Sequence, residues 1–223
     1  MLYVIATPIG NLRDITYRAV EILRAVGKVY CEDTRRTKVL CEEFGIDKPL
    51  ESFHQHSAGK ISKIISELKS GKEIAYVTDA GTPGVQDPGG LLVERAHQEG
   101  IRVVPIPGPS AITAVLSVAG VPADSFWFAG YVPTKKGRQT FIKKLLASDQ
   151  TVVFFETAPR LLKLLDQIIE FGGAERLMIV GRELTKQFEE VRRATVAELK
   201  NYYQENPSRG ELVIVLAPSK KTY

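Results

Sequence analysis

Two short segments carry charged side chains of the kinds that bind anions or move protons. The segment EDTRRT places Glu32 and Asp33 just before Arg35 and Arg36, at the start of a predicted helix. Basic residues there oppose the helix dipole, and arginines can hold phosphates through paired hydrogen bonds. The segment therefore indicates an anion site, with a solvated ion-pair cluster as the alternative. Glu183 and Lys186, in GRELTKQFEE, could act as acid–base or orienting groups, or form a structural ion pair.

A third segment, VPTKKGRQTFIKK, is strongly basic. It carries Lys135, Lys136, Arg138, Lys143 and Lys144. Such a patch suits a phosphate backbone, and a solvated helix face is the alternative. The net charge of +4 permits an anionic partner without requiring one.

Loops rich in glycine and proline form a second kind of candidate site. TDAGTPGVQDPGG follows an apolar run at residues 73–77, and ATPIGNLRDIT and PIPGPSAIT follow two others. Glycines let a backbone approach a ligand closely, and prolines hold a loop in one shape. Because α/β proteins bind ligands at the carboxyl ends of strands, these loops predict a backbone-lined site rather than plain connections. Neither GxGxxG nor GxxxxGK[ST] is present, which argues against a Rossmann dinucleotide site and a P-loop.

The elements that must position these residues alternate in the first half of the chain. We expect strands at 2–6, 28–31, 73–77 and 101–106, and helices at 15–26, 34–44, 58–68 and 91–98, the first capped by Asp14. This alternation predicts a mainly parallel sheet with helices on its faces.

The pattern changes in the second half. We expect strands at 125–131, 151–155, 177–180, 188–194 and 211–216, and helices at 111–119, 137–146, 161–171 and 196–203. Strands without intervening helices predict a mixed or antiparallel sheet. The chain is therefore expected to form two α/β domains, 1–112 and 113–223, with a ligand cleft between them.

Composition excludes several classes of protein. Of 223 residues, 44% are hydrophobic and 25% charged, which is typical of a soluble globular chain. Cys31 and Cys41 form no CxxC pair, and His54 and His56 lack a carboxylate or cysteine set nearby, so no metal site is expected. Two reduced thiols suit a cytoplasmic location. No apolar run approaches the roughly 20 residues of a membrane span, and MLYVIATPIG is typical of a first strand rather than a signal peptide.

Five motifs in order, TPIGNLRD, EDTRRT, TDAGTPGVQDPG, PIPGPSA and GRELTKQFEE, resemble the tetrapyrrole methylase superfamily. Within it, they look most like the branch that methylates small-subunit ribosomal RNA. The resemblance covers nearly the whole chain. It implies the class III methyltransferase fold, a homodimer, and S-adenosylmethionine bound between the domains. It also implies 2′-O-methylation of a cytidine in the decoding region of 16S ribosomal RNA.

The resemblance also assigns residues. The cofactor should contact Pro8, Asp79, Gly81, Val85, Ser110, Ala111, Phe155, Leu184 and Ala217. Arg35, Arg36, Lys135, Lys136 and Lys186 become candidates for RNA contact. Proton removal from the ribose hydroxyl would fall to Glu32, Asp33 or Glu183, or Lys186 would stabilise the developing alkoxide. These alternatives stay open at this point.

The chain departs from the family pattern in the middle loop and at its end. Thr78 and Gln86 stand where the family usually has serines, and Gln86 leaves a side-chain role there in doubt. Relatives often carry a helical extension after the last strand, so we expect RNA binding that is weaker or supplied by a dimer. A small-tetrapyrrole methyltransferase and a non-catalytic RNA-binding or ribosome-assembly protein are the other hypotheses, and the basic segments count against the first.

Overall fold

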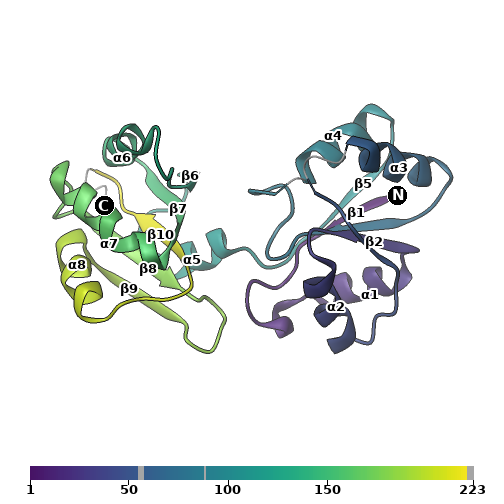
Figure 1. The fold of residues 1–223 in the computed structure, drawn as a ribbon, viewed down its shortest axis with the longest axis horizontal. Helices are drawn as coiled ribbons and strands as arrows, with labels where there is room; N and C mark the ends of the chain where they lie inside the picture. The colour runs from purple at the N-terminus through teal and green to yellow at the C-terminus, as the bar shows by residue number, and fades with distance from the viewer. Residues whose placement is uncertain (55–57, 88, 220–223) are drawn as a thin grey trace. The chain divides into compact units, whose positions relative to one another are not determined.

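The computed structural model describes residues 1–54, 58–87 and 89–219. The chain divides into two compact units, Met1–Ser110 and Ala111–Tyr223, each built around its own five-stranded sheet (Figure 1). Helices pack on both faces of each sheet, which confirms the predicted α/β fold class.

The first sheet is parallel throughout, in the order β3-β2-β4-β1-β5. Its strands are β1 (Leu2–Ile5), β2 (Lys28–Cys31), β3 (Leu50–Ser52), β4 (Ile74–Val77) and β5 (Val103–Ile106). Strand β3 was not predicted from the sequence. Because the other strands alternate buried side chains between two apolar clusters, both faces of the sheet are covered.

Four of the described helices cover this sheet, and the short 3-10 helix η1 (Leu12–Asp14) lies in the loop after β1 and buries no residue. Helices α1 (Tyr17–Ala25) and α2 (Thr34–Glu43) pack on one face, and α3 (Ala58–Lys69) and α4 (Gly89–Gln98) on the other (Figure 1). The expectation that Asp14 caps α1 is wrong. Thr16 is the cap, since its hydroxyl accepts the Ala19 N–H at 3.2 Å, whereas Asp14 belongs to η1.

The second sheet is mixed, in the order β6-β7-β10-β8-β9. Its strands are β6 (Phe126–Tyr131), β7 (Thr151–Thr157), β8 (Leu177–Arg182), β9 (Glu190–Thr195) and β10 (Glu211–Leu216), and only β6 and β7 pair in parallel. Helix α5 (Ala111–Ala119) packs on one face. The other face carries α6 (Arg138–Leu146), α7 (Ala158–Glu170) and α8 (Val196–Glu205).

The loop after β8 has an unusual backbone. Glu183 and Thr185 have φ angles of 48° and 66°, in the left-handed region that residues other than glycine seldom adopt. The Glu183 carboxylate holds this turn, because its Oε1 accepts the Glu211 N–H at 3.0 Å and the Lys186 ammonium at 3.1 Å. The Glu183 N–H in turn donates to the Glu211 carbonyl at 3.1 Å. The strained turn is thus fastened to the start of β10.

Gly210 leaves room for that carboxylate. A Cβ on Gly210 would lie 2.2 Å from Glu183 Oε1, and the residue has a φ of +90°. Gly172 offers a matched comparison, because its φ is +83° but a Cβ there would meet nothing within 4 Å. The two glycines therefore separate backbone strain from the steric clash.

We predict that Gly210→Ala lowers the free energy of unfolding by roughly 2–4 kcal/mol, the sum of left-handed strain and overpacking. Gly172→Ala should cost only the strain, about 1–2 kcal/mol. Urea denaturation of both variants measures the difference. In a Glu183→Ala background the cost of Gly210→Ala should fall to that of Gly172→Ala. Equal costs for the two single variants would show that the Glu183 carboxylate does not need this space.

Candidate functional site

The neighbouring central strands β1 and β4 are followed by loops that are joined at the carboxyl ends of the strands. The Thr7 N–H donates to the Gly81 carbonyl at 3.0 Å, and the Gly81 N–H donates to the Thr7 carbonyl at 3.0 Å. The Thr7 hydroxyl also donates to the Thr78 carbonyl at 3.1 Å. From these neighbouring strands the chain continues to α1 on one face and to α4 on the other. Such divergence marks the usual ligand site of an open α/β sheet.

A third loop, after β5, contacts these two loops. The Thr82 hydroxyl donates to the Pro109 carbonyl at 3.2 Å. A Cβ on Gly108 would lie 3.1 Å from that of Ala6, so the backbones of these loops approach closely. The structure therefore brings together three glycine- and proline-rich loops that the sequence singled out.

The predicted cofactor residues of the first unit all belong to these loops. Pro8 is buried, and Gly81 has a φ of +81°, which a side chain would strain. Ser110 ends the loop after β5, and Ala111 begins α5. Val85 is exposed, and its N–H is bound to the Asp87 carboxylate at 2.9 Å.

Asp87 organises the middle loop and was not singled out from the sequence. Its carboxylate accepts the Val85 N–H at 2.9 Å, the Gly89 N–H at 2.7 Å and the Tyr76 hydroxyl at 3.1 Å. Gly89 is sterically required, because a Cβ there would lie 2.4 Å from the Tyr76 ring. An aspartate two residues before the first residue of a helix is the signal that could have identified it.

Gln86 lies within this loop. Its φ is 64°, and its side chain is exposed. The position is thus constrained through its backbone, which is unfavourable for a residue other than glycine, asparagine or aspartate.

Glu32 and Asp79 link the ends of β2 and β4. Glu32 Oε2 accepts the Asp79 N–H at 3.2 Å, and Asp79 Oδ1 accepts the Asp33 N–H at 2.9 Å. Partial burial raises the pKa of Glu32, and the nearby charges of Asp79 and Asp87 raise it further. Glu32 is therefore a carboxylate that can take up a proton more readily than an exposed glutamate.

Asp33 has the opposite environment. It caps α2 by accepting the Arg35 N–H at 2.9 Å, and its second oxygen lies 2.7 Å from the Arg35 guanidinium. These hydrogen bonds hold the pKa of Asp33 well below its usual range. Asp33 is therefore a poor proton acceptor, and its contacts suit a structural role.

The arginines of EDTRRT are exposed, and each pairs with one carboxylate. The Arg35 side chain is 89% exposed, and that of Arg36 is 66% exposed with its guanidinium 3.6 Å from Asp79. The carboxylates of Asp33 and Asp79 thus offset the basic charge at the start of α2. Because exposed ion pairs contribute at most about 1 kcal/mol, a phosphate can compete for these arginines.

In the second unit, Ala111, Phe155 and Leu184 pack around one apolar cluster on the face that α5 covers. Ala217 lies apart from them. The register pairs Phe155 with Val213, and the Ala217 N–H bonds the Leu177 carbonyl at the far end of β8 from Leu184. Leu184 and Ala217 thus lie toward opposite ends of β10, and their contact with one cofactor stays a prediction.

Glu183 and Lys186 form an ion pair at 3.1 Å. The hydrogen bond from the Glu211 backbone, followed by that from Lys186, lowers the pKa of Glu183. Partial burial opposes protonation of Lys186, but contacts with Glu183 and Glu211 outweigh it and raise the Lys186 pKa. Glu183 is thus ionised, and its carboxylate is bound to Lys186 and to the Glu211 N–H. Lys186 remains a cation at neutral pH.

The basic segment before and within α6 is smaller as a patch than the sequence suggests. Arg138 is buried and pairs with Glu156 at 3.3 Å. The ammonium groups of Lys143 and Lys144 lie 4.9 Å and 4.6 Å from the ring centroids of Phe171 and Trp127. Lys135 and Lys136 are both exposed. The interpretation of Arg138 as a phosphate contact is therefore wrong.

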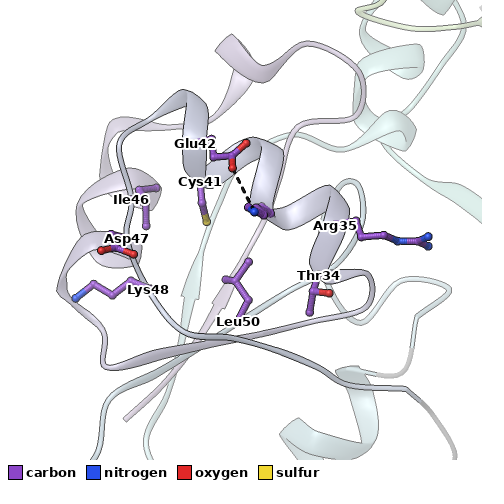
Figure 2. Close-up of a pocket in the computed structure, with 9 residues that line it drawn as sticks. Thr34, Arg35, Cys41, Glu42, Ile46, Asp47, Lys48 and Leu50 are labelled. Atoms are coloured by element: carbon purple, nitrogen blue, oxygen red, sulfur yellow. Dashed lines mark ion pairs between the residues drawn. The ribbon is translucent and has the colours of Figure 1, made fainter.

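A hollow of about 410 Å³ lies beside α2 (Figure 2). It is lined by Thr34, Arg35, Lys38, Cys41, Glu42, Ile46, Asp47, Lys48 and Leu50. Arg35 points away from the other lining side chains (Figure 2). Arg35 is the one predicted site residue that lines this hollow, so the hollow is separate from the three glycine- and proline-rich loops.

The remaining candidates were metal ligands and thiols. His54 is exposed, and His56 lies outside the described residues. Within residues 1–54, 58–87 and 89–219, no group of His, Cys, Asp and Glu could hold a metal ion. Cys31 and Cys41 are free and buried, and burial raises the pKa of both thiols. Among the helices described, none is long and apolar enough to cross a bilayer.

Comparison with known proteins places this geometry in a family. Residues 1–200 match the model of the tetrapyrrole (corrin/porphyrin) methylases. A protein of Mesorhizobium japonicum called ribosomal RNA small subunit methyltransferase I is 47% identical over 98% of this chain and 76% of its own length. The Thermotoga maritima protein of the same name is 43% identical over 97% of both chains.

Solved structures agree on the fold. A diphthine synthase superimposes with a TM-score of 0.74 at 19% identity, covering 97% of this chain and 89% of its own. The uroporphyrin-III-C-methyltransferase of Thermus thermophilus gives a TM-score of 0.68 at 18% identity, covering 97% and 93%. The chain therefore belongs to the tetrapyrrole methylase family of S-adenosylmethionine-dependent methyltransferases.

Proposed function

We propose that this protein is a ribosomal RNA small subunit methyltransferase that methylates the 2′ hydroxyl of a cytidine in 16S ribosomal RNA. The observation that carries the proposal is the 43–47% identity to proteins of that name across almost the whole chain. The exposed cations Arg35, Arg36, Lys135 and Lys136 support an RNA substrate over a small tetrapyrrole, which would need fewer positive charges.

The three glycine- and proline-rich loops of the first unit fit S-adenosylmethionine. When bound, this cofactor supplies an electrophilic methyl group on a sulfonium. Its amino and ribose hydroxyl groups suit the backbone carbonyls of these loops and the Asp79 carboxylate, and glycines at 81 and 108 let the loop backbones lie close together. Because the methyl group is already reactive, the protein's main task is positioning, which can supply about 7–11 kcal/mol.

Glu32 is the residue we assign to removal of the ribose proton. Its raised pKa lets it hold a proton, whereas Asp33 and Glu183 have lowered pKa values and are committed to Arg35 and Lys186. Lys186 is a cation at neutral pH, so any role in the reaction is to stabilise negative charge rather than to accept a proton.

The dimer and the location stay predictions. A homodimer would show as twice the monomer mass in analytical ultracentrifugation. A cytoplasmic location is consistent with the relatives named as ribosomal RNA methyltransferases.

Incubation with methyl-labelled cofactor and small ribosomal subunits, followed by nucleoside analysis, tests the activity. We expect label in 2′-O-methylcytidine. Label in a methylated base would refute the ribose assignment, and label only in an added porphyrinoid would refute the RNA substrate. Binding of the cofactor without transfer to RNA or porphyrinoid would favour the non-catalytic alternative.

We predict that Glu32→Gln lowers kcat by about 10²- to 10⁴-fold, the usual contribution of a general base. Glutamine keeps an oxygen for the Asp79 N–H, so the cofactor Kd should stay unchanged. The wild-type rate should fall as pH drops through the raised pKa of Glu32, and the residual rate of Glu32→Gln should lack that fall. Glu43→Gln, at an exposed site on α2, is the control. An unchanged kcat would remove Glu32 from the mechanism.

Arg36→Ala should weaken RNA binding and lower the salt dependence of log K by about 0.7–0.9, because one phosphate contact is lost. Its cofactor affinity should be unaffected. Lys72→Ala removes the same charge just before the amino end of β4, away from the loops at the carboxyl ends, and should leave RNA binding intact. An equal effect of the two variants would indicate a general response to net charge.

A further inference from the structure

The end of β6 presents an aromatic side chain that has no role in the proposed function so far. Tyr131 is 50% exposed. Its ring packs on that of Phe155 with centroids 5.2 Å apart, and Phe155 in turn contacts Phe128 at 5.2 Å. The tyrosine ring is therefore supported from one side and open to solvent elsewhere.

An irregularity in the strand sets the direction of Tyr131. In a regular strand, residues three apart point to opposite faces, so Phe128 and Tyr131 would be separated by the sheet. Here the β6–β7 register shifts between Phe128 and Tyr131, and Gly130 has a φ of +72°. Both rings consequently contact Phe155. Bulges that re-aim a side chain are frequent beside functional sites.

The turn that follows Tyr131 carries two cations and is firmly held. Arg138 donates to the Pro133 carbonyl at 3.0 Å, and Arg160 donates to the Val132 and Pro133 carbonyls. Both arginines pair with the fully buried carboxylate of Glu156, each at 3.3 Å. The backbone between β6 and α6 is thus fixed from below.

Lys135 and Lys136 lie at the exposed top of this turn. Among the described residues, no ion pair or hydrogen bond is made by either ammonium group, whereas the side chains of Arg138, Arg160, Lys143 and Lys144 contact carboxylates or aromatic rings. Two adjacent exposed cations on a rigid turn form a local positive charge that attracts anions. Partial burial and the charge of Glu211 raise the pKa of Tyr131, so its ring stays neutral and does not repel an anion.

A supported aromatic ring beside two cations is the combination that binds single-stranded nucleic acid. Building on the RNA substrate proposed above, we propose that Tyr131 stacks on an unpaired base of the RNA while Lys135 and Lys136 hold the flanking phosphates. The second unit thereby gains an RNA contact of its own. Phe155 was predicted as a cofactor contact, so the main competing role for Tyr131 is to bind the cofactor.

Fluorescence anisotropy with a labelled single-stranded RNA of about 12 nucleotides, within the usual site size, tests the stacking. Tyr131→Ala should weaken binding by roughly 5- to 150-fold, the equivalent of about 1–3 kcal/mol per stacked base, without changing the salt dependence. Tyr131→Phe keeps the ring and should bind like wild type. A duplex of the same sequence should bind Tyr131→Ala and wild type equally, because its bases are not available for stacking.

Loss of Lys135 and Lys136 should change the salt dependence of RNA binding, unlike loss of Tyr131. The double variant Lys135→Ala/Lys136→Ala should lower the salt dependence of log K by about 1.4 for single-stranded RNA, at about 0.7 per phosphate. Cofactor affinity, measured by calorimetry, should be unchanged in all variants.

Three results would overturn the proposal. These are unaltered RNA binding by Tyr131→Ala, a matching loss of cofactor affinity, or a Tyr131→Phe variant as weak as Tyr131→Ala. Failure of the proposed function would appear separately, as wild-type protein that transfers no methyl group to ribosomal RNA.

Discussion

The reciprocal backbone hydrogen bonds between Thr7 and Gly81 are the contact on which the candidate site of the first unit depends. They join the loops after β1 and β4 at the point where the chain diverges to opposite faces of the sheet. Since both partners are main-chain groups, the contact constrains backbone shape more than side-chain chemistry. This explains loops rich in glycine and proline, whose charged members such as Asp87 hold the backbone in shape.

The regular part of the fold could be predicted because each central strand alternates between two buried faces. Tyr3 and Ile5 contact one apolar cluster, and Leu2 contacts the other. Strand β3 gave no such signal. Its three residues are half-buried at the sheet edge, and only pairing with β2 defines them as a strand. Local signals similarly could not decide between Asp14 and Thr16 as the cap, because both residue types cap helices.

The sequence showed which site residues are charged or lie in loops, but not which residues they contact. Arg138 and Lys135 belong to one basic run, yet Arg138 is buried against Glu156 while Lys135 is exposed. The difference comes from α7, which carries Gln167 to the Arg138 guanidinium at 2.7 Å. The position of Ala217 depends likewise on distant contacts, since the pairing of β10 with β8 places it at the opposite end of β10 from Leu184. Such facts depend on contacts between residues far apart in the chain.

Glu32 and Glu183 show how environment divides work between identical side chains. Both follow a strand and accept a backbone N–H, but Glu32 lies beside two carboxylates and Glu183 beside a lysine. Partial burial, helped by the like charges, raises the pKa of Glu32, whereas the hydrogen bond from the Glu211 backbone, followed by that from Lys186, lowers the pKa of Glu183. A group that must take up a proton needs the first setting, and a group that must hold a strained turn needs the second. The contacts with the Glu211 N–H and Lys186 that hold Glu183 in its turn are therefore also what make it a poor base.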